Sequence, residues 1–473
     1  MAPLDDNVLL ITGKAPPKAL LRLRDFFTLT HQDFAMVSAH LQPFDAAAIL
    51  VSLAAILGYL NHRVLKLPSS IGLTIMGAVA SLLVIGIDWL LPSSLMAENV
   101  RNFLADIDFH DTLMEGMLSF LLFAGALHVD WADMKRGRWP IMLLSTLGVG
   151  ISTFIVGSGF YFIAGFLGIQ IGFLWCLVFG ALISPTDPVA VIGVLKRAAV
   201  PPTLQATVAG ESLFNDGVGV VVFGILLTAA LGTSEFSAGH AALDFLKEAG
   251  GGAVLGGLVG WLGFRAMRSI DEYNVEVMIS LAVVMGGYSL AHFLHVSGPV
   301  AMAVAGLLIG NAGVKLAMSD MTRDYLLKFW ALIDELLNAV LFFLIGLEVI
   351  AVAPTLVLVL TGIVTIPLVI GARIAGVGIP LLVLHPFQAL SSMTLPTLVW
   401  GGLRGGISIA LALSLPEGPE RTVILSVTYV VVLFSVIVQG GTISGLIDRL
   451  KKRSSEIAKA DSNATDAAGS ASR

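Results

Sequence analysis

The sequence predicts an all-α polytopic membrane protein, with about thirteen transmembrane helices in inverted repeats and two crossing broken helices. The first observation is composition: of 473 residues, 56% are hydrophobic and only 13% are charged, whereas a soluble domain carries roughly 25% charged residues. The second is length, because apolar stretches near the ~20 residues that a helix needs to cross a bilayer recur along nearly the whole chain. The third is that polar residues, prolines and glycines interrupt two of these stretches.

The expected spans follow the apolar stretches in chain order. The short alternating segments of an outer-membrane barrel do not occur in the sequence, so each span is expected to be a helix. Boundaries derived in this way carry an error of a few residues. The expected ranges are 45–62, 69–92, 112–128, 140–166, 171–195, 206–232, 247–267, 275–296, 298–313, 330–352, 354–384, 391–415 and 422–447.

The two ends of the chain differ from this apolar body. Residues 1–44 form a polar N-terminal extension that lacks the charged start, apolar core and cleavage site of a secretory signal. Residues 451–473 are small and polar, and we expect a disordered cytoplasmic tail. The transmembrane domain is therefore expected over 45–450. Its single cysteine, Cys176, lies in an apolar run and is expected to pack there.

Basic residues predict the orientation, because Lys and Arg in short loops are enriched on the cytoplasmic side. One set of alternate loops holds only Arg101, Lys247 and Arg421. This asymmetry supports an odd number of spans, an outside N-terminus and a cytoplasmic C-terminus. The expected location is the cell (inner) membrane. The basic residues of the other set are Arg63, Lys66, Lys135, Arg136, Arg138, Lys196, Arg197, Arg265, Arg268, Lys315, Arg323, Lys328, Arg449, Lys451, Lys452 and Arg453.

The sixth span contains an unusually polar window, GESLFNDG at 210–217. A charge at bilayer depth costs at least ~2.5 to 3.5 kcal/mol, so retained charges usually face a cavity or a partner. Ser212 and Asp216 share a helix face, and Asp216 is a candidate cation ligand and proton carrier. Glu211 lies roughly 140° around the helix from Asp216 and faces another neighbour. The alternative is a structural polar knot that includes Asn215.

The fifth span contains Pro185 and Pro188, which remove backbone donors and crowd the preceding turn. A continuous helix is therefore not expected. Freed carbonyls at such breaks build the ion sites of many transporters, and Thr186 and Asp187 supply further oxygen ligands there. The alternative is that Asp187 only caps the half-helix that follows.

The twelfth span carries a matching break, with four glycines around Arg404 in GGLRGG at 401–406. Spans five and twelve cross in opposite directions, which is the pattern of an inverted-repeat secondary transporter. Arg404 would offset helix ends or carboxylates at the crossing. Arg373, in the eleventh span, is the natural counter-ion of Glu211. A purely structural role stays open for both arginines.

Three motifs in this order, SPTDPVAV, GESLFNDG and GLRGGISIAL, resemble the monovalent cation:proton antiporters of the NhaP and sodium/proton exchanger type. The resemblance covers about 45 to 450 and implies a homodimer, in which core helices carry 171–232 and 391–447 and further helices dimerise. It also implies that Asp216 is the essential carboxylate and that Asn215 marks the electroneutral branch. Phe123 departs from animal exchangers, which tend to have an acidic residue there. The ion ligands that the resemblance implies are Asp216, Asp187, Thr186, Ser212 and, as a further candidate, Glu211.

The resulting hypothesis is exchange of Na+ for H+, with Li+ or K+ left open as the cation. Burial disfavours the charged form of a carboxyl group whereas a bound cation favours it, so proton and cation compete for one site. Hard oxygen ligands suit such a cation, and the sequence has no GxxxxGK[ST] loop for a nucleotide. We therefore expect a transporter rather than an enzyme, with no cofactor and no nucleic-acid partner. The alternatives are a sodium-coupled solute carrier or channel and, remotely, an intramembrane aspartyl protease.

Overall fold

The structure is a computed structural model that describes residues 43–90, 100, 117–198, 200–232, 238–313, 318–350, 355–386 and 393–453. Nearly all of the predicted N-terminal extension and C-terminal tail lies outside these residues. The chain divides into two compact units, Met1–Ile49 and Leu50–Arg473. The second unit contains the polar motifs and is the one considered below.

The described residues fold into helices, and their one isolated extended pairing joins Asp187 and Leu403. Short π-helical or 3₁₀ turns continue several helices. The α-helices are α3 (Pro43–Leu60), α4 (Ser69–Leu90), α7 (Leu118–Leu127), α8 (Trp131–Arg136), α9 (Arg138–Leu143), α10 (Val149–Phe166), α11 (Phe173–Leu182), α12 (Val189–Arg197), α13 (Pro202–Ala230), α14 (Ala238–Phe245), α15 (Gly251–Met267), α16 (Tyr273–Phe293), α17 (Gly298–Leu308), α19 (Asp320–Leu347), α20 (Leu356–Leu384), α21 (Thr394–Trp400), α22 (Gly406–Leu413) and α23 (Pro419–Phe434).

The helical membrane class predicted from the sequence is confirmed. Within the described residues, seven helices are long and apolar enough to cross a bilayer. Shorter apolar helices add to these, among them α7, α11 and α17. The count of thirteen spans stays a prediction.

Helix α19 begins well before its expected span of 330–352. Ser319 caps its start, because the Ser319 hydroxyl accepts a hydrogen bond from the backbone N–H of Thr322. The first turns carry the exposed ion pair of Lys328 with Asp324, whose atoms are 2.6 Å apart. Hydropathy locates only the apolar part of a helix, so the charged turns were missed.

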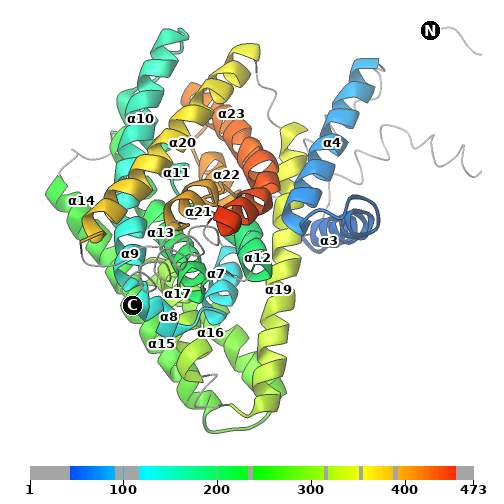
Figure 1. Cartoon of the computed structure of the whole chain (residues 1–473), viewed down its shortest axis with the longest axis vertical. Helices are drawn as coiled ribbons and strands as arrows, with labels where there is room; N and C mark the ends of the chain where they lie inside the picture. Colours follow the sequence, from blue (N-terminus) through cyan, green and yellow to red (C-terminus); the bar gives the residue numbers. More distant parts are fainter. Residues whose placement is uncertain are drawn as a thin grey trace, which may run out of the picture. The chain divides into compact units, whose positions relative to one another are not determined.

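Helix contacts in the second unit concentrate in two groups. In one, α4 packs against α19, and α17 packs against α7 and α15. In the other, α11 packs against α10 and α13, while α20 packs against α10 and α23; Figure 1 shows α4 beside α19 and α10 near α20.

Small residues allow these close approaches. A Cβ at Gly180 of α11 would lie 2.3 Å from the carbonyl oxygen of Thr153 in α10, so the two backbones touch. Cys176 is fully buried in the same helix, and its predicted packing role is confirmed. The two breaks, one after α11 and one after α21, are built into the second group.

Candidate functional site

The first break follows from two prolines. Helix α11 ends at Leu182 and α12 begins at Val189. A continuing helix would bond the Ser184 carbonyl to the backbone N–H of residue 188, but Pro188 has none. Asp187 satisfies a free backbone donor at the start of α12, since its Oδ1 accepts a 2.9 Å hydrogen bond from the Val189 N–H. The predicted interruption is confirmed, and Asp187 does cap the second half-helix.

The second break lies between α21, which ends at Trp400, and α22, which begins at Gly406. The two breaks meet, because the backbone N–H of Asp187 donates a 2.7 Å hydrogen bond to the carbonyl of Leu403. A Cβ at Gly405 would lie only 2.7 Å from the Cβ and Oδ2 atoms of Asp187. The predicted crossing of the two broken helices is therefore confirmed, and glycine permits it.

Each break leaves the carboxyl end of a half-helix in the interior, and an arginine satisfies each end. The Nη1 atom of Arg404 donates to the carbonyls of Ser184 and, at 3.0 Å, Pro185. Arg373 donates to the Leu398 carbonyl from Nε and Nη2, at 3.2 and 3.0 Å. A cation at the carboxyl end of a helix also offsets the helix dipole. The partner of Arg404 is thus the backbone of the other break.

Arg373 also makes the predicted ion pair with Glu211. Its Nη1 and Nη2 atoms lie 2.7 and 2.9 Å from Oε1 and Oε2 of Glu211, and both side chains are buried. Such a bidentate pair satisfies two buried charges at once. Glu211 accepts a further 2.8 Å hydrogen bond from Nδ2 of Asn215. Both Glu211 oxygens are thus bound, and Glu211 does not line the cavity described below.

Asn215 links α13 to the first break. Its Nδ2 donates a 2.8 Å hydrogen bond to the Thr186 hydroxyl, and its Oδ1 accepts one of 3.3 Å from the Thr186 N–H. The Thr186 hydroxyl lies 3.1 Å from that of Ser212. One network therefore joins Arg373, Glu211, Asn215, Thr186 and Ser212.

This network ends at a cavity of about 780 Å³, lined by Thr186, Asp187 and Asp216 among others. Asp216 is buried, and within the described chain its Oδ1 atom has no hydrogen-bond partner. A buried carboxylate oxygen without a donor is costly unless a proton or a cation occupies it. The cavity thus offers an unsatisfied acidic group to a small positive ligand.

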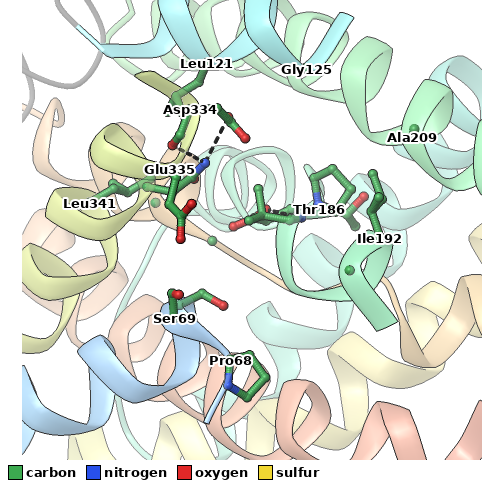
Figure 2. A pocket seen from close by; sticks show the side chains of 18 of the residues that line it. Pro68, Ser69, Leu121, Gly125, Thr186, Ile192, Ala209, Asp334, Glu335 and Leu341 are labelled. Atoms are coloured by element: carbon green, nitrogen blue, oxygen red, sulfur yellow. Dashed lines mark hydrogen bonds between the residues drawn. The ribbon is translucent and has the colours of Figure 1, made fainter. Parts of the chain in front are cut away.

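Three cavity residues on α19 were not predicted from the sequence. Asp334, Glu335 and Asn338 line it opposite the first break, and Figure 2 shows Asp334 and Glu335 facing the side that holds Thr186. The Asn338 amide donates to Oδ1 and to the carbonyl of Asp334, at 3.0 and 2.8 Å. The i and i+4 spacing of Asp334 and Asn338, in the otherwise apolar part of α19 after Lys328, was the available signal.

The cavity also reaches Ser408, which follows the second break in the sequence.

The departure from animal exchangers at Phe123 has a structural consequence. Phe123 is fully buried, and its ring centroid lies 4.7 Å from that of Trp330. An aromatic contact between α7 and α19 therefore occupies the place where the family resemblance suggested an acid.

The crossed half-helices with a carboxylate cavity define a membrane transporter of the inverted-repeat antiporter fold. The solved sodium proton antiporter MjNhaP1 from Methanocaldococcus jannaschii has this fold, with a TM-score of 0.66 and 21% identity, over 86% of this chain and 98% of that one. The family described as Sodium/hydrogen exchanger, transmembrane, matches residues 50–449.

Curated relatives agree with this match. The Na(+)/H(+) antiporter NhaP of Pseudomonas aeruginosa is 49% identical over 410 residues, which is 86% of this chain and 96% of the relative. The Na(+)/H(+) antiporter NhaH of Halobacillus dabanensis is 33% identical, over 85% of this chain and 96% of its own length. The chain therefore belongs to the sodium/hydrogen exchanger family. It is a transporter, so the protease alternative is set aside.

Proposed function

We propose that this protein exchanges Na+ for H+ across the membrane by competition at Asp216. The observation that carries the proposal is that Asp216 lines the cavity and has a buried carboxylate oxygen without a donor among the described residues. The relatives named as Na(+)/H(+) antiporters support the choice of ions.

The proposed Na+ ligands are oxygens at the first break and on α13. Asp216 and Asp187 supply charge, and Thr186 and Ser212 supply neutral hydroxyls that already lie 3.1 Å apart. Oxygen is the ligand that hard monovalent cations prefer. Glu211 is assigned to Arg373 instead, because both of its oxygens are engaged.

Competition at one carboxylate gives the coupling and its pH dependence. When Asp216 holds a proton it cannot hold Na+ well, and bound Na+ expels the proton. As pH falls, the protonated fraction grows, so the apparent KM for Na+ rises. The rise approaches about tenfold per pH unit once the proton dominates the site.

The basic residues that line the cavity support an opening toward the cytoplasmic side. Lys66, Lys196 and Arg197 are among its lining residues, and the excess of basic residues in their set of loops favours the cytoplasmic side for them. We infer an inward-open state in the cell (inner) membrane, with the C-terminus cytoplasmic. The group of α11, α13, α20 and α23 would carry the ion past a dimerised group that includes α19. The same proposal includes assembly as a homodimer and exchange of one Na+ for one H+. It requires no resident cofactor.

Proton flux in proteoliposomes tests the function. A fluorescent pH indicator inside the vesicles should report proton movement after addition of NaCl, and the apparent KM for Na+ should rise as pH is lowered. LiCl and KCl, added in turn, define selectivity. Uptake of radioactive sodium without proton movement would contradict the proposal and favour a channel or a sodium-coupled carrier.

A further inference from the structure

Ser408, a residue of the cavity lining, carries a second buried oxygen without a hydrogen-bond partner in the described structure. Its side chain is buried, its Oγ has no hydrogen-bond partner in the described structure, and the residue lines the same cavity as Asp216. Buried hydroxyls almost always have a partner, so each exception requires an explanation. A missing partner at a cavity wall indicates a place where a ligand supplies one.

The second break explains why Ser408 lacks a partner. A serine or threonine inside a helix usually donates to a carbonyl three or four residues earlier, as Thr428 does to Ile424 at 2.7 Å and Ser414 does to Leu411 at 2.9 Å. Helix α22 begins at Gly406, so Ser408 lies in its first turn. The carbonyls three and four residues earlier belong to Gly405, whose backbone is extended, and to Arg404, and both residues precede the helix. The break therefore frees the hydroxyl.

The position of Gly405 places Ser408 near the acidic groups. The Gly405 backbone touches Asp187, since a Cβ there would lie 2.7 Å from the Asp187 Oδ2 atom. Ser408 follows three residues later, about one turn along the same face. Helices α13 and α22 also contact each other, which brings the Asp216 side of the cavity close.

We infer that the Ser408 hydroxyl is a ligand of the transported cation, supplied by the second broken helix. This inference rests on the proposed exchange of Na+ for H+. The hydroxyl oxygen is an acceptor and does not titrate at working pH, so it stabilises the cation but does not hold the exchanged proton. Loss of Ser408 should therefore weaken Na+ binding and leave proton binding at Asp216 unchanged.

The test compares Ser408→Ala with a matched control. Thr397 of α21 also has a fully buried hydroxyl without a partner in the described chain, but it does not line the cavity. We expect Ser408→Ala to raise the apparent KM for Na+ about three- to tenfold, the effect of losing one neutral contact. The maximal rate should be kept and the factor should be equal at each pH. Thr397→Val should leave the KM unchanged.

Two further variants make the test independent of how well the alanine variant folds. Ser408→Thr keeps the hydroxyl and should keep the KM close to that of the wild type. Ser408→Cys keeps the size but replaces a hard oxygen with a soft sulfur, so it should raise the KM for Na+. An unchanged KM in both Ser408→Ala and Ser408→Cys would overturn the inference, as would an equal rise in Thr397→Val.

A binding measurement separates this inference from the proposed function. The rise in melting temperature on adding NaCl to the purified protein at alkaline pH should shrink in Ser408→Ala and persist in Thr397→Val. If the wild type is stabilised by NaCl in this Ser408-dependent way but moves no protons, the ligand assignment stands and the exchange reaction is wrong. If the wild type exchanges and Ser408→Ala binds Na+ equally well, the ligand assignment alone is wrong.

Discussion

Arg373 binds both oxygens of Glu211, at 2.7 and 2.9 Å, while the same guanidinium also binds the Leu398 carbonyl. This geometry ties the interrupted end of α21 to α13, the helix of Asp216. Glu211 in turn holds Asn215, which holds Thr186 at the other break. The ion pair therefore helps to position α13, which carries Asp216, and the first break, which carries Thr186.

The first prediction is that Glu211 and Arg373 couple strongly in stability. Each single change, Glu211→Gln or Arg373→Gln, leaves one buried charge without its partner, which costs about 3–5 kcal/mol. The double variant should lose clearly less than the sum, measured as melting temperature of the purified protein. The exposed pair Lys328 and Asp324 is the control, where the losses should be small because solvent screens the two charges. Additive losses at Glu211 and Arg373 would show that the pair is not coupled.

The second prediction concerns the carrier carboxylate. Asp216→Asn keeps size and removes the charge from an oxygen that has no donor in the described structure. Exchange should be abolished, because position 216 then offers neither a titratable proton nor a charged ligand, while the melting temperature is kept. Sodium-dependent proton flux in proteoliposomes checks the outcome. Wild-type flux in this variant would remove Asp216 from the mechanism.

The third prediction separates charge from capping at Asp187. Asn caps helices about as well as Asp, so Asp187→Asn should retain the bond to the Val189 N–H and the melting temperature. Exchange should nevertheless nearly vanish if Asp187 charge helps to hold the cation. Thr186→Ala should raise the apparent KM for Na+ several-fold. If both changes lower only stability and leave the KM intact, capping is the whole role of this segment.

Several of these features were predictable because they follow from local chemistry. Pro185 and Pro188, three residues apart, remove backbone donors and favour a break, and the glycines around Arg404 permit a second break. A single charge at bilayer depth is costly, and this cost predicts that Glu211 and Arg373 form an ion pair. Composition and segment length are sufficient for the helical class.

Other features depend on helix rotation and packing, which the pattern of one chain leaves open. Asp334 and Asn338 could have faced solvent or a neighbour, and only the packing of α19 turns them toward the cavity. The carbonyl partners of Arg404 depend on where the two breaks cross. Ser408 lies within the motif GLRGGISIAL, but its lack of a partner is explained only by the start of α22 at Gly406.

The fourth prediction concerns Gly402 in the second break. A Cβ there would lie 2.4 Å from Nε of Arg373, too close for both to stay in place. Gly402→Ala should displace the guanidinium from Leu398 and lower the melting temperature. Gly441→Ala is the control, because a Cβ at Gly441 meets nothing within 4 Å. Equal melting temperatures for the two variants would show that the guanidinium is free to move.

The geometry around Asn215 bears on the charge balance of the exchange. The Asn215 amide donates at 2.8 Å to both Thr186 and Glu211. Replacement by Asp removes both donors and places a carboxylate beside that of Glu211. Two carboxylates this close are not both charged at low cost, so one of them binds a proton more tightly. Arg373 already pairs with the Glu211 carboxylate and cannot fully neutralise a second carboxylate as well.

The fifth prediction is that the rate and equilibrium of wild-type exchange are independent of membrane potential. Asn215→Asp should change the pH profile of exchange without changing the net charge moved in a cycle. In the wild type, one Na+ and one H+ alternate at Asp216, so no net charge moves in a cycle. In the variant, the added proton is held between the new carboxylate at position 215 and Glu211. Neither position lines the cavity, and Thr186 lies between position 215 and the cavity, so this proton affects Asp216 without being carried. Exchange in proteoliposomes under an imposed potassium-diffusion potential measures charge movement, and a series of buffers measures the profile. A wild-type equilibrium displaced by voltage would refute one-for-one exchange, and voltage dependence appearing in Asn215→Asp without a pH shift would show that the added proton is transported.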